Sequence, residues 1–304
     1  MKILVLGTGA VGGYFGGRLA EGGNELYFTA RGANLTALLN DGLKVESING
    51  NFDITIDVRE KFDPIEGVDL ILLCAKTGDT RGLLPIIKEH MNDTSVVVSL
   101  QNGVESESIL EEAIPAESII GGIAFIGSNR YAPGRIRHTG GGSITLGELT
   151  GEKTERIERI RSMFADAGVE CRVTGKIIKP KWEKLVWNAG FNGLSAITGV
   201  AAEKLLSYKP TRNIVSKLME ETIAVAQNKS IPVDSTMAER HIETTEKMKD
   251  VIPSMLQDIR AGRTTEIDSI NGAVCREGEK AGIATPYNET IVAAVSAIDE
   301  ARRT

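Results

Sequence analysis

The first residues of the chain, Met1–Gly17 (MKILVLGTGAVGGYFGG), decide its fold. An apolar run from Ile3 to Leu6 is short enough for a strand that is buried on both faces. The motif G-x-G-x-x-G follows at once, as Gly7–Gly12, and a helical pattern comes after it. This order of strand, glycine-rich turn and helix is typical of dinucleotide-binding proteins. It predicts an α/β protein that begins with a Rossmann-type domain.

Each glycine of this motif has its own physical task. We expect Gly7 to form a tight turn, Gly9 to let a pyrophosphate approach the backbone, and Gly12 to let the helix pack closely on the strand. The free N–H groups and the positive dipole end of the helix favour phosphate at this point. The alternative is a glycine-rich turn that binds nothing. The predicted pyrophosphate-binding residues are Gly7, Thr8, Gly9, Ala10, Val11 and Gly12.

The composition indicates an ordinary globular protein. Its 304 residues are enough for about two domains, and 41% of them are hydrophobic. The formal charge of −6 argues against nucleic acid or an anionic membrane surface as a partner. No apolar run approaches the roughly 20 residues that span a bilayer, and the N-terminal run is too short for a signal peptide. We therefore expect a cytoplasmic protein.

The cysteines and histidines carry no metal or disulfide pattern. Cys74, Cys171 and Cys275 form no C-x-x-C pair and lie within apolar patterns, which predicts reduced, buried thiols. The histidines are scattered, without metal-ligand spacing. No metal site is expected.

Informative residues follow four of the predicted strands. The glycine motif follows the first strand, Arg31 follows a strand at 25–30, Lys76 follows 68–75, and Asn102 follows 95–100. In an open α/β sheet, ligands bind outside the carboxyl ends of the strands. Each residue alone is weak evidence, because such a lysine is usually solvated and Asn-Gly is usually a turn. Together they indicate a ligand-binding cleft.

The end of the second strand bears on the choice of cofactor. An NAD-specific site carries an acidic residue there to hold the ribose 2′-hydroxyl, whereas this chain has Arg31 followed by glycine. An arginine pairs with a 2′-phosphate and lies over an adenine face. Arg31 therefore favours NADP(H), with a solvated surface arginine as the alternative.

The pattern of the chain changes after residue 118. Residues 119–148 hold short apolar runs split by glycines and a proline, which predicts antiparallel strands added at the sheet edge. A helix at 153–167 and a short strand at 169–173 complete the first domain. Beyond Gly175 we expect only helices, interrupted at prolines. The predicted domains are residues 1–175 and 176–304.

A polar stripe marks the helical half. Lys184, Asn188 and Asn192 recur every four residues within KWEKLVWNAGFNGL (181–194), so they share one face of a helix. The stripe either faces solvent or lines a polar cleft, and spacing alone slightly favours the solvated face. A second polar cluster at 253–272 is equally open between surface charge and a site.

The chain resembles the ketopantoate reductase (2-dehydropantoate 2-reductase) family over essentially its whole length. The matching motifs, in order, are GTGAVG, Lys76, LQNGV, PGRIRHTG, KWEKLVWNAGFN, SMLQDIRAGRTTEID and INGAV. The block SMLQDI…TEID…NG is particular to this family. The resemblance implies a Rossmann-type N-terminal domain and an all-α C-terminal domain like that of 6-phosphogluconate dehydrogenase, with the active site in the cleft between them.

The resemblance also implies an activity and residue roles. The activity is NADPH-dependent reduction of ketopantoate to (R)-pantoate, an oxidoreductase step in pantothenate and coenzyme A biosynthesis. A homodimer is implied in the same way. Lys184 would donate the proton. The substrate would be bound by Asn102, Lys184, Asn188, Asn192 and Ser254, and the cofactor, besides the glycine motif, by Arg31, Lys76, Asn102, Ile126 and Glu266.

These residue types suit the chemistry. Hydride transfer to the C2 ketone of a 2-keto acid leaves negative charge on the carbonyl oxygen. An ammonium such as that of Lys184 stabilises the charge and supplies the proton, which is worth about 10²–10⁴-fold in rate. Lysine has an ordinary pKa of about 10.4, so we expect it to act as an acid at neutral pH without tuning.

Two departures from the family pattern concern the substrate. Family members commonly carry Asn where this chain has Ala202 and Val251. Both positions belong to the substrate side of the site. One alternative is therefore a relative that reduces another 2-keto acid, and a second is a non-catalytic NADP-binding sensor.

Overall fold

The computed structural model describes residues 1–302, which form two compact units. The first unit comprises Met1–Gln101 and Ser106–Ile177, and the second comprises Asn102–Glu105 and the chain from Ile178 onward. The predicted boundary between residues 175 and 176 lies close to the end of the first unit. Sequence analysis did not anticipate that residues 102–105 belong with the second unit.

The first unit is built on one mixed sheet. Its parallel part has the order β5-β2-β1-β6-β7-β8, which is the strand order of a doubly wound dinucleotide-binding sheet. The α/β prediction is thereby confirmed. The strands are β1 (Lys2–Leu6), β2 (Glu25–Thr29), β3 (Leu43–Ser47), β4 (Phe52–Ile54), β5 (Asp57–Arg59), β6 (Leu70–Leu73), β7 (Val96–Ser99), β8 (Ile119–Ala132), β9 (Arg135–Glu148) and β10 (Cys171–Val173).

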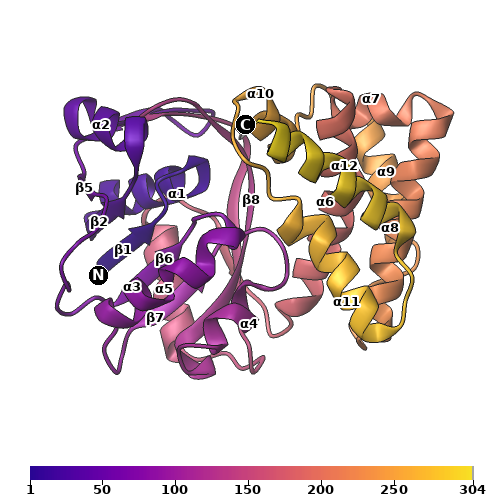
Figure 1. Ribbon diagram of the computed structural model, residues 1–304. Coiled ribbons are helices and arrows are strands. Elements are labelled where there is room, and N and C mark those ends of the chain that lie inside the picture. Colours follow the sequence, from indigo (N-terminus) through magenta and orange to yellow (C-terminus); the bar gives the residue numbers. More distant parts are fainter. Residues whose placement is uncertain (303–304) are drawn as a thin grey trace. The chain divides into compact units, whose positions relative to one another are not determined.

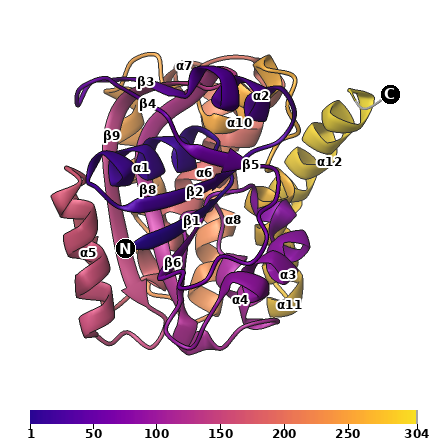
Figure 2. The same cartoon turned by 90° about the vertical axis from the view of Figure 1, so that its left-hand side faces the viewer.

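Helices cover both faces of this sheet (Figure 2). Ile3 and Val5 of β1 pack into a cluster with residues of α1 and α5, whereas Leu4 and Leu6 pack into a cluster with α3 and α4. The apolar run of β1 is therefore buried on both faces, as expected. The helices are α1 (Ala10–Glu21), α2 (Gly32–Asp41), α3 (Thr80–His90), α4 (Ser106–Glu111) and α5 (Glu155–Asp166), with 3-10 turns η1 (Thr77–Asp79) and η2 (Ala116–Ser118).

The position predicted for the antiparallel pair is wrong. Strands β8 and β9 do pair antiparallel, but β3 and β4 lie beyond β9 and form that edge of the sheet. The glycines of α1 explain the arrangement, because they let side chains of β3 and β4 pack against the helix. A Cβ added at Gly17 would lie 2.5 Å from Phe52 and 3.2 Å from Leu43.

The second unit is helical among the described residues, as expected. Helix α6 contacts α8 and α12, and the three lie side by side in Figure 1. Glycines permit this close packing, since a Cβ at Gly190 would lie 2.5 Å from Met219 and one at Gly193 2.2 Å from Ile291. The elements are α6 (Ile178–Thr198), α7 (Ala202–Leu206), α8 (Lys209–Asn228), α9 (Met237–Glu246), α10 (Ser254–Arg260), the π-helical turn η3 (Asp268–Gly272), α11 (Ala273–Ala281) and α12 (Pro286–Ala301).

The cysteines are less buried than the sequence predicts. Cys74, Cys171 and Cys275 are free thiols, but each is half-buried. Cys74 directly follows the end of β6 and Cys171 begins β10, which pairs with β9 alone. Burial still raises the pKa of Cys171 to about 12, so this group stays a thiol at neutral pH. Among residues 1–302, no helix combines the length and apolar character needed to cross a membrane.

Candidate active site

The turn after β1 has the steric features of a phosphate-binding loop. Gly7 adopts φ +98°, and a Cβ there would lie 2.6 Å from the backbone nitrogen of Ala75. A Cβ at Gly12 would lie 2.2 Å from the carbonyl oxygen of Gly7, so both positions require glycine for packing alone. At Gly9, the N-cap of α1, a Cβ would meet nothing within 4 Å. Packing within the protein therefore does not explain why residue 9 is a glycine, whereas close approach of a ligand to the backbone would explain it.

Two residues that sequence analysis missed hold this turn. The backbone N–H of Gly7 donates to Oγ1 of Thr29 at 3.0 Å, and the hydroxyl of Thr8 donates to the carbonyl oxygen of Thr29 at 2.8 Å. Buried Asn34 donates to the carbonyl oxygen of Thr8 at 2.9 Å and accepts from the N–H of Gly134. No local pattern marks Thr29 or Asn34, because each acts through residues distant in the chain.

Arg31 and Lys76 follow strands on either side of β1. Since β2, β1 and β6 are neighbouring parallel strands, both residues lie at the same sheet edge as the glycine turn. Arg31 is the exposed N-cap of α2, and its guanidinium has no hydrogen-bond or ion-pair partner within residues 1–302. Lys76 is the half-buried N-cap of η1. Gln101 supports this second strand end by donating to the carbonyl oxygen of Ala75 at 2.8 Å.

Ile126, the remaining cofactor candidate of the first unit, lies further along the sheet. It is half-buried on β8, opposite Gly141 of β9, at an irregularity in the strand pairing. Its predicted role, like those of Arg31, Lys76 and the glycine motif, stays a prediction.

The second unit brings three candidate residues into one hydrogen-bonded chain. The ammonium Nζ of Lys184 on α6 donates to Oδ1 of Asn102 at 3.1 Å. The amide Nδ2 of Asn102 in turn donates to Oε2 of Glu266 at 2.9 Å. Asn102 thus lies between a cation and an anion with its amide oriented to match both.

The surroundings of Lys184 change its acidity. Burial lowers the pKa of Lys184 to about 8, the negative charge of Glu266 opposes this shift, and the positive charge of Lys181 adds to it. The shift was not anticipated from the sequence, but it leaves the expectation that Lys184 is protonated at neutral pH in place. A group that titrates near pH 8 is still mainly protonated at neutral pH and releases its proton more readily.

The polar stripe on α6 does not face solvent, which corrects the slight preference drawn from spacing. Asn188 and Asn192 are 6% and 1% exposed. The Oδ1 atom of Asn192 accepts from Oγ of Ser254 and from the N–H of Met255, both at 3.2 Å, so it meets the start of α10. Its Nδ2 atom is buried and has no hydrogen-bond partner within residues 1–302. A buried donor of this kind is costly unless a ligand or water accepts from it.

Asp299 holds the segment that carries Glu266. Its Oδ2 atom accepts from the N–H of Thr265 at 3.0 Å and from the Thr265 hydroxyl at 2.7 Å. Two residues after Glu266 the chain enters η3, and π-helical turns are frequent at functional sites. Sequence analysis did not identify Asp299, which acts from the far end of the chain.

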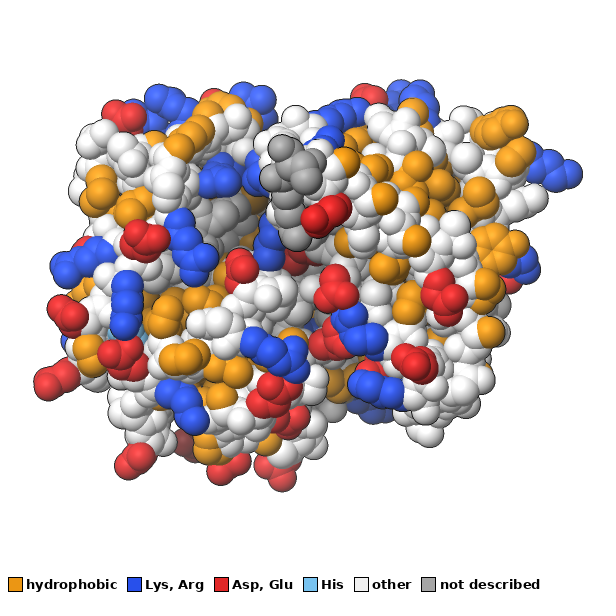
Figure 3. All heavy atoms as spheres, in the orientation of Figure 1, with side chains coloured by type: hydrophobic (Ala, Val, Ile, Leu, Met, Phe, Trp, Pro, Cys, Tyr) orange, Lys and Arg blue, Asp and Glu red, His pale blue; other side chains and the backbone are white. Residues whose placement is uncertain are grey.

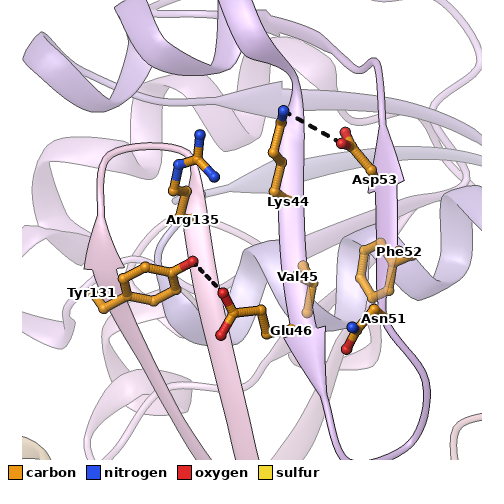
Figure 4. A pocket seen from close by; sticks show the side chains of 8 residues that line it. All are labelled: Lys44, Val45, Glu46, Asn51, Phe52, Asp53, Tyr131 and Arg135. Carbon is orange, nitrogen blue, oxygen red and sulfur yellow. Dashed lines mark hydrogen bonds and ion pairs between the residues drawn. The ribbon is translucent and has the colours of Figure 1, made fainter.

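The first unit also has a hollow whose lining includes none of the predicted site residues. It has a volume of about 360 Å³ and is lined by residues of β3, β4, β8 and β9 with their adjoining turns. Lys44 pairs with Asp53, and the hydroxyl of Tyr131 donates to Glu46 at 2.7 Å (Figure 4). Because these charged groups satisfy one another, we assign the hollow no function.

Charge on the visible surface is mixed. The face in Figure 3 carries both Lys and Arg and Asp and Glu side chains.

The doubly wound sheet with its glycine turn, followed by a helical unit that gathers a lysine, amides and a carboxylate, is typical of the two-domain dehydrogenases. A family model described as "Ketopantoate reductase PanE/ApbA" matches residues 3–151, and its "C terminal" counterpart matches residues 176–299. The chain belongs to the ketopantoate reductase family.

Similar proteins extend over the whole chain. A 2-dehydropantoate 2-reductase of Pyrococcus horikoshii is 32% identical, with 98% of this chain and 97% of that protein covered. The crystal structure of a 2-dehydropantoate 2-reductase from Geobacter metallireducens is 35% identical, with a TM-score of 0.91 and coverage of 98% and 99%. The structure of a D-mandelate dehydrogenase with NADH and anilino(oxo)acetate is 27% identical, with a TM-score of 0.92 and full coverage of both chains. The relatives are thus oxidoreductases, and they act on more than one substrate.

Proposed function

We propose that this protein is an NADPH-dependent reductase of ketopantoate that forms (R)-pantoate. The observation that carries the proposal is the hydrogen-bonded chain of Lys184, Asn102 and Glu266, which supplies an ammonium acid next to a polar anchor. Membership of the ketopantoate reductase family over both units supports the same activity. The proposal places this reaction in pantothenate and coenzyme A biosynthesis. It also includes a homodimer in the cytoplasm.

The first unit fits a nicotinamide dinucleotide. The open space at Gly9 leaves room for a pyrophosphate against the backbone, and α1 begins there without a side-chain cap on its N–H groups. In the proposal residues 7–12 hold the pyrophosphate, and Arg31 with Lys76 holds the 2′-phosphate. Ile126 and Glu266 contact the cofactor elsewhere. When bound, the reduced nicotinamide supplies a hydride.

Lys184 is the proposed catalytic acid. Its ammonium stabilises the oxyanion that develops on the C2 carbonyl oxygen and transfers a proton from Nζ to that oxygen. The carboxylate of Glu266 favours the charged form of Lys184, and Asn102 fixes the direction of the ammonium. The amide side chains of Asn102, Asn188 and Asn192 add polar groups to the site without adding charge.

Asn188, Asn192 and Ser254 are the proposed substrate residues. The unpartnered Nδ2 of Asn192 is a buried donor that a carboxylate or hydroxyl oxygen of the substrate would satisfy. Asn192 is already oriented by its bonds to the start of α10, so little side-chain freedom remains to be lost on binding.

A second candidate is a reductase of a different 2-keto acid. Ala202 is fully buried, and its N–H donates to the carbonyl oxygen of Val251 at 2.9 Å, so two apolar residues adjoin where family members commonly carry asparagines. The similar D-mandelate dehydrogenase structure contains anilino(oxo)acetate, an aromatic 2-keto acid derivative. An apolar substrate side would favour a bulkier, less polar acid than ketopantoate.

A panel of substrates tests the proposal. We would follow NADPH oxidation with ketopantoate, a branched aliphatic 2-keto acid and an aromatic 2-keto acid. Highest kcat/KM with ketopantoate supports the first candidate, and highest kcat/KM with another acid supports the second. Tight NADPH binding with no turnover of any acid would instead favour a non-catalytic sensor.

A further inference from the structure

We propose that Arg276 is a positioning residue, which holds Asn102 in place between Lys184 and Glu266. The inference rests on the proposed function, since it concerns the arrangement of that catalytic site. Arg276 lies on α11. It acts on the two chain segments that carry Asn102 and Glu266.

The first of these segments is residues 102–105. The guanidinium of Arg276 donates to both carboxylate oxygens of Glu105, from Nε at 3.0 Å and from Nη2 at 2.7 Å. A bidentate arginine–carboxylate pair fixes direction as well as distance. The side chain of Glu105 is 19% exposed, so water screens this pair less than an open surface pair.

The second segment carries Glu266 and enters η3 two residues later. Nη1 of Arg276 donates to Oδ1 of Asp268 at 2.6 Å, and Nη2 donates to the carbonyl oxygen of Asp268 at 2.8 Å. One guanidinium therefore ties Glu105 to Asp268. Glu105 stands three positions after Asn102, and Asp268 stands two positions after Glu266.

The backbone between the two segments is in close contact as well. Gly103 adopts φ +89°, and a Cβ there would lie 2.4 Å from the carbonyl oxygen of Ser269 in η3. Val104 packs against the apolar core of the second unit. Residues 102–105 are thus held by backbone contact, by apolar packing, by the hydrogen bonds of Asn102 and by the Arg276 ion pairs. Arg276→Gln removes the ion pairs and leaves the other contacts in place.

Four variants test this role: Arg276→Gln, Asn102→Ala, the double variant, and Arg212→Gln as a control. The Arg212 side chain is 39% exposed, as is that of Arg276, and it pairs with Glu246 within the same unit. We would measure kcat and KM for each. Hydrogen–deuterium exchange of the peptide containing residues 102–105 would be measured in the unliganded proteins.

We expect Arg276→Gln to lower kcat by about 10- to 100-fold through misplacement of Asn102, with KM for the cofactor changed by less than about threefold. Exchange at residues 102–105 should become faster. In the double variant the loss should be no greater than in Asn102→Ala alone, because Arg276 acts through Asn102. Arg212→Gln should match the unsubstituted protein in all of these measurements.

Multiplicative losses in the double variant would overturn the proposal, and so would unchanged exchange at residues 102–105. If the unsubstituted protein reduces no 2-keto acid, the proposed function fails. The exchange measurement then still decides whether Arg276 holds the segment. If Arg276→Gln exchanges rapidly throughout the chain, it has lost its fold, and Arg276→Lys takes its place in the experiment. Lysine keeps the positive charge but not the planar guanidinium that forms the bidentate pair, so we expect the same effects on kcat and on exchange, but smaller ones.

Discussion

The Nζ atom of Lys184 lies 3.1 Å from Oδ1 of Asn102, although the two residues are 82 positions apart. Asn102 follows a strand of the sheet but belongs by its contacts to the helical unit. The proposed acid and its anchor therefore form one preorganised pair inside that unit. Preorganisation of this kind lowers the cost of orienting groups during reaction.

Replacement of Lys184 should abolish most turnover. We expect Lys184→Met to lower kcat by about 10²–10⁴-fold, because both the proton and the charge that stabilises the oxyanion are lost. NADPH affinity, measured by fluorescence titration, should change little. Lys179→Met is the matched control, since Lys179 lies on the same helix and pairs with Glu183. Equal turnover in Lys184→Met and the control would show that Lys184 is not the acid.

The rate should depend on pH through Lys184. Its pKa is lowered to about 8, and the protonated form is the active one. We therefore expect kcat/KM to be constant well below pH 8 and to fall about tenfold per pH unit above it. Glu266→Gln removes the charge that raises this pKa, so the fall should begin at lower pH. Lys181→Met removes a charge that lowers it, so the fall should begin at higher pH. If kcat/KM falls over the same pH range in both variants as in the unsubstituted protein, a group other than Lys184 causes the fall.

The two glycines Gly9 and Gly12 should respond differently to alanine. Gly9→Ala meets no protein atom within 4 Å, so the melting temperature should stay within about 2 °C while NADPH affinity falls at least about tenfold. Gly12→Ala forces a Cβ to 2.2 Å from a backbone oxygen, so it should lower stability itself. Thermal denaturation and NADPH titration separate the two effects. If Gly9→Ala binds NADPH as tightly as the unsubstituted protein, the turn at Gly9 does not contact the cofactor.

Arg31 should decide between the two nicotinamide cofactors. A charged hydrogen bond to phosphate is worth about 1.5–3 kcal/mol, so Arg31→Ala should raise KM for NADPH by about 10- to 100-fold and leave KM for NADH nearly unchanged. Arg59→Ala is the control, because Arg59 ends the neighbouring strand β5 but pairs with Asp57 at 3.3 Å. An equal rise for both cofactors would contradict recognition of a 2′-phosphate by Arg31.

Val251 should influence the choice of keto acid. Val251→Asn places an amide at a half-buried position that is commonly Asn in the family. We expect the ratio of kcat/KM for ketopantoate to that for an aromatic 2-keto acid to rise by about two- to tenfold, since one added hydrogen bond is worth about 0.5–1.5 kcal/mol. Val251→Ala controls for size alone. A ratio that moves equally in both variants would point to volume rather than hydrogen bonding.

Local features of the chain predicted much of the fold. The apolar run of β1, the glycine turn and the helix after it are specified by neighbouring residues, because strand and helix periodicities are short-range properties. The position of Arg31 just after β2 and the helical character of the second unit could be predicted for the same reason. The four-residue spacing also placed Lys184, Asn188 and Asn192 on one helix face.

What that face contacts was decided by tertiary structure. Spacing slightly favoured solvent for the stripe, yet Asn188 and Asn192 are buried, and Asn192 is hydrogen-bonded to the start of α10, which packs against α6. Contacts such as Lys184–Asn102 and Arg276–Glu105 join residues far apart in the chain, and no periodicity records such pairs. The sequence by itself determined which elements form and which chemical groups they carry. Tertiary packing alone decided that Asn102 joins the helical unit, because burial and hydrogen bonding between distant segments depend on the assembled fold.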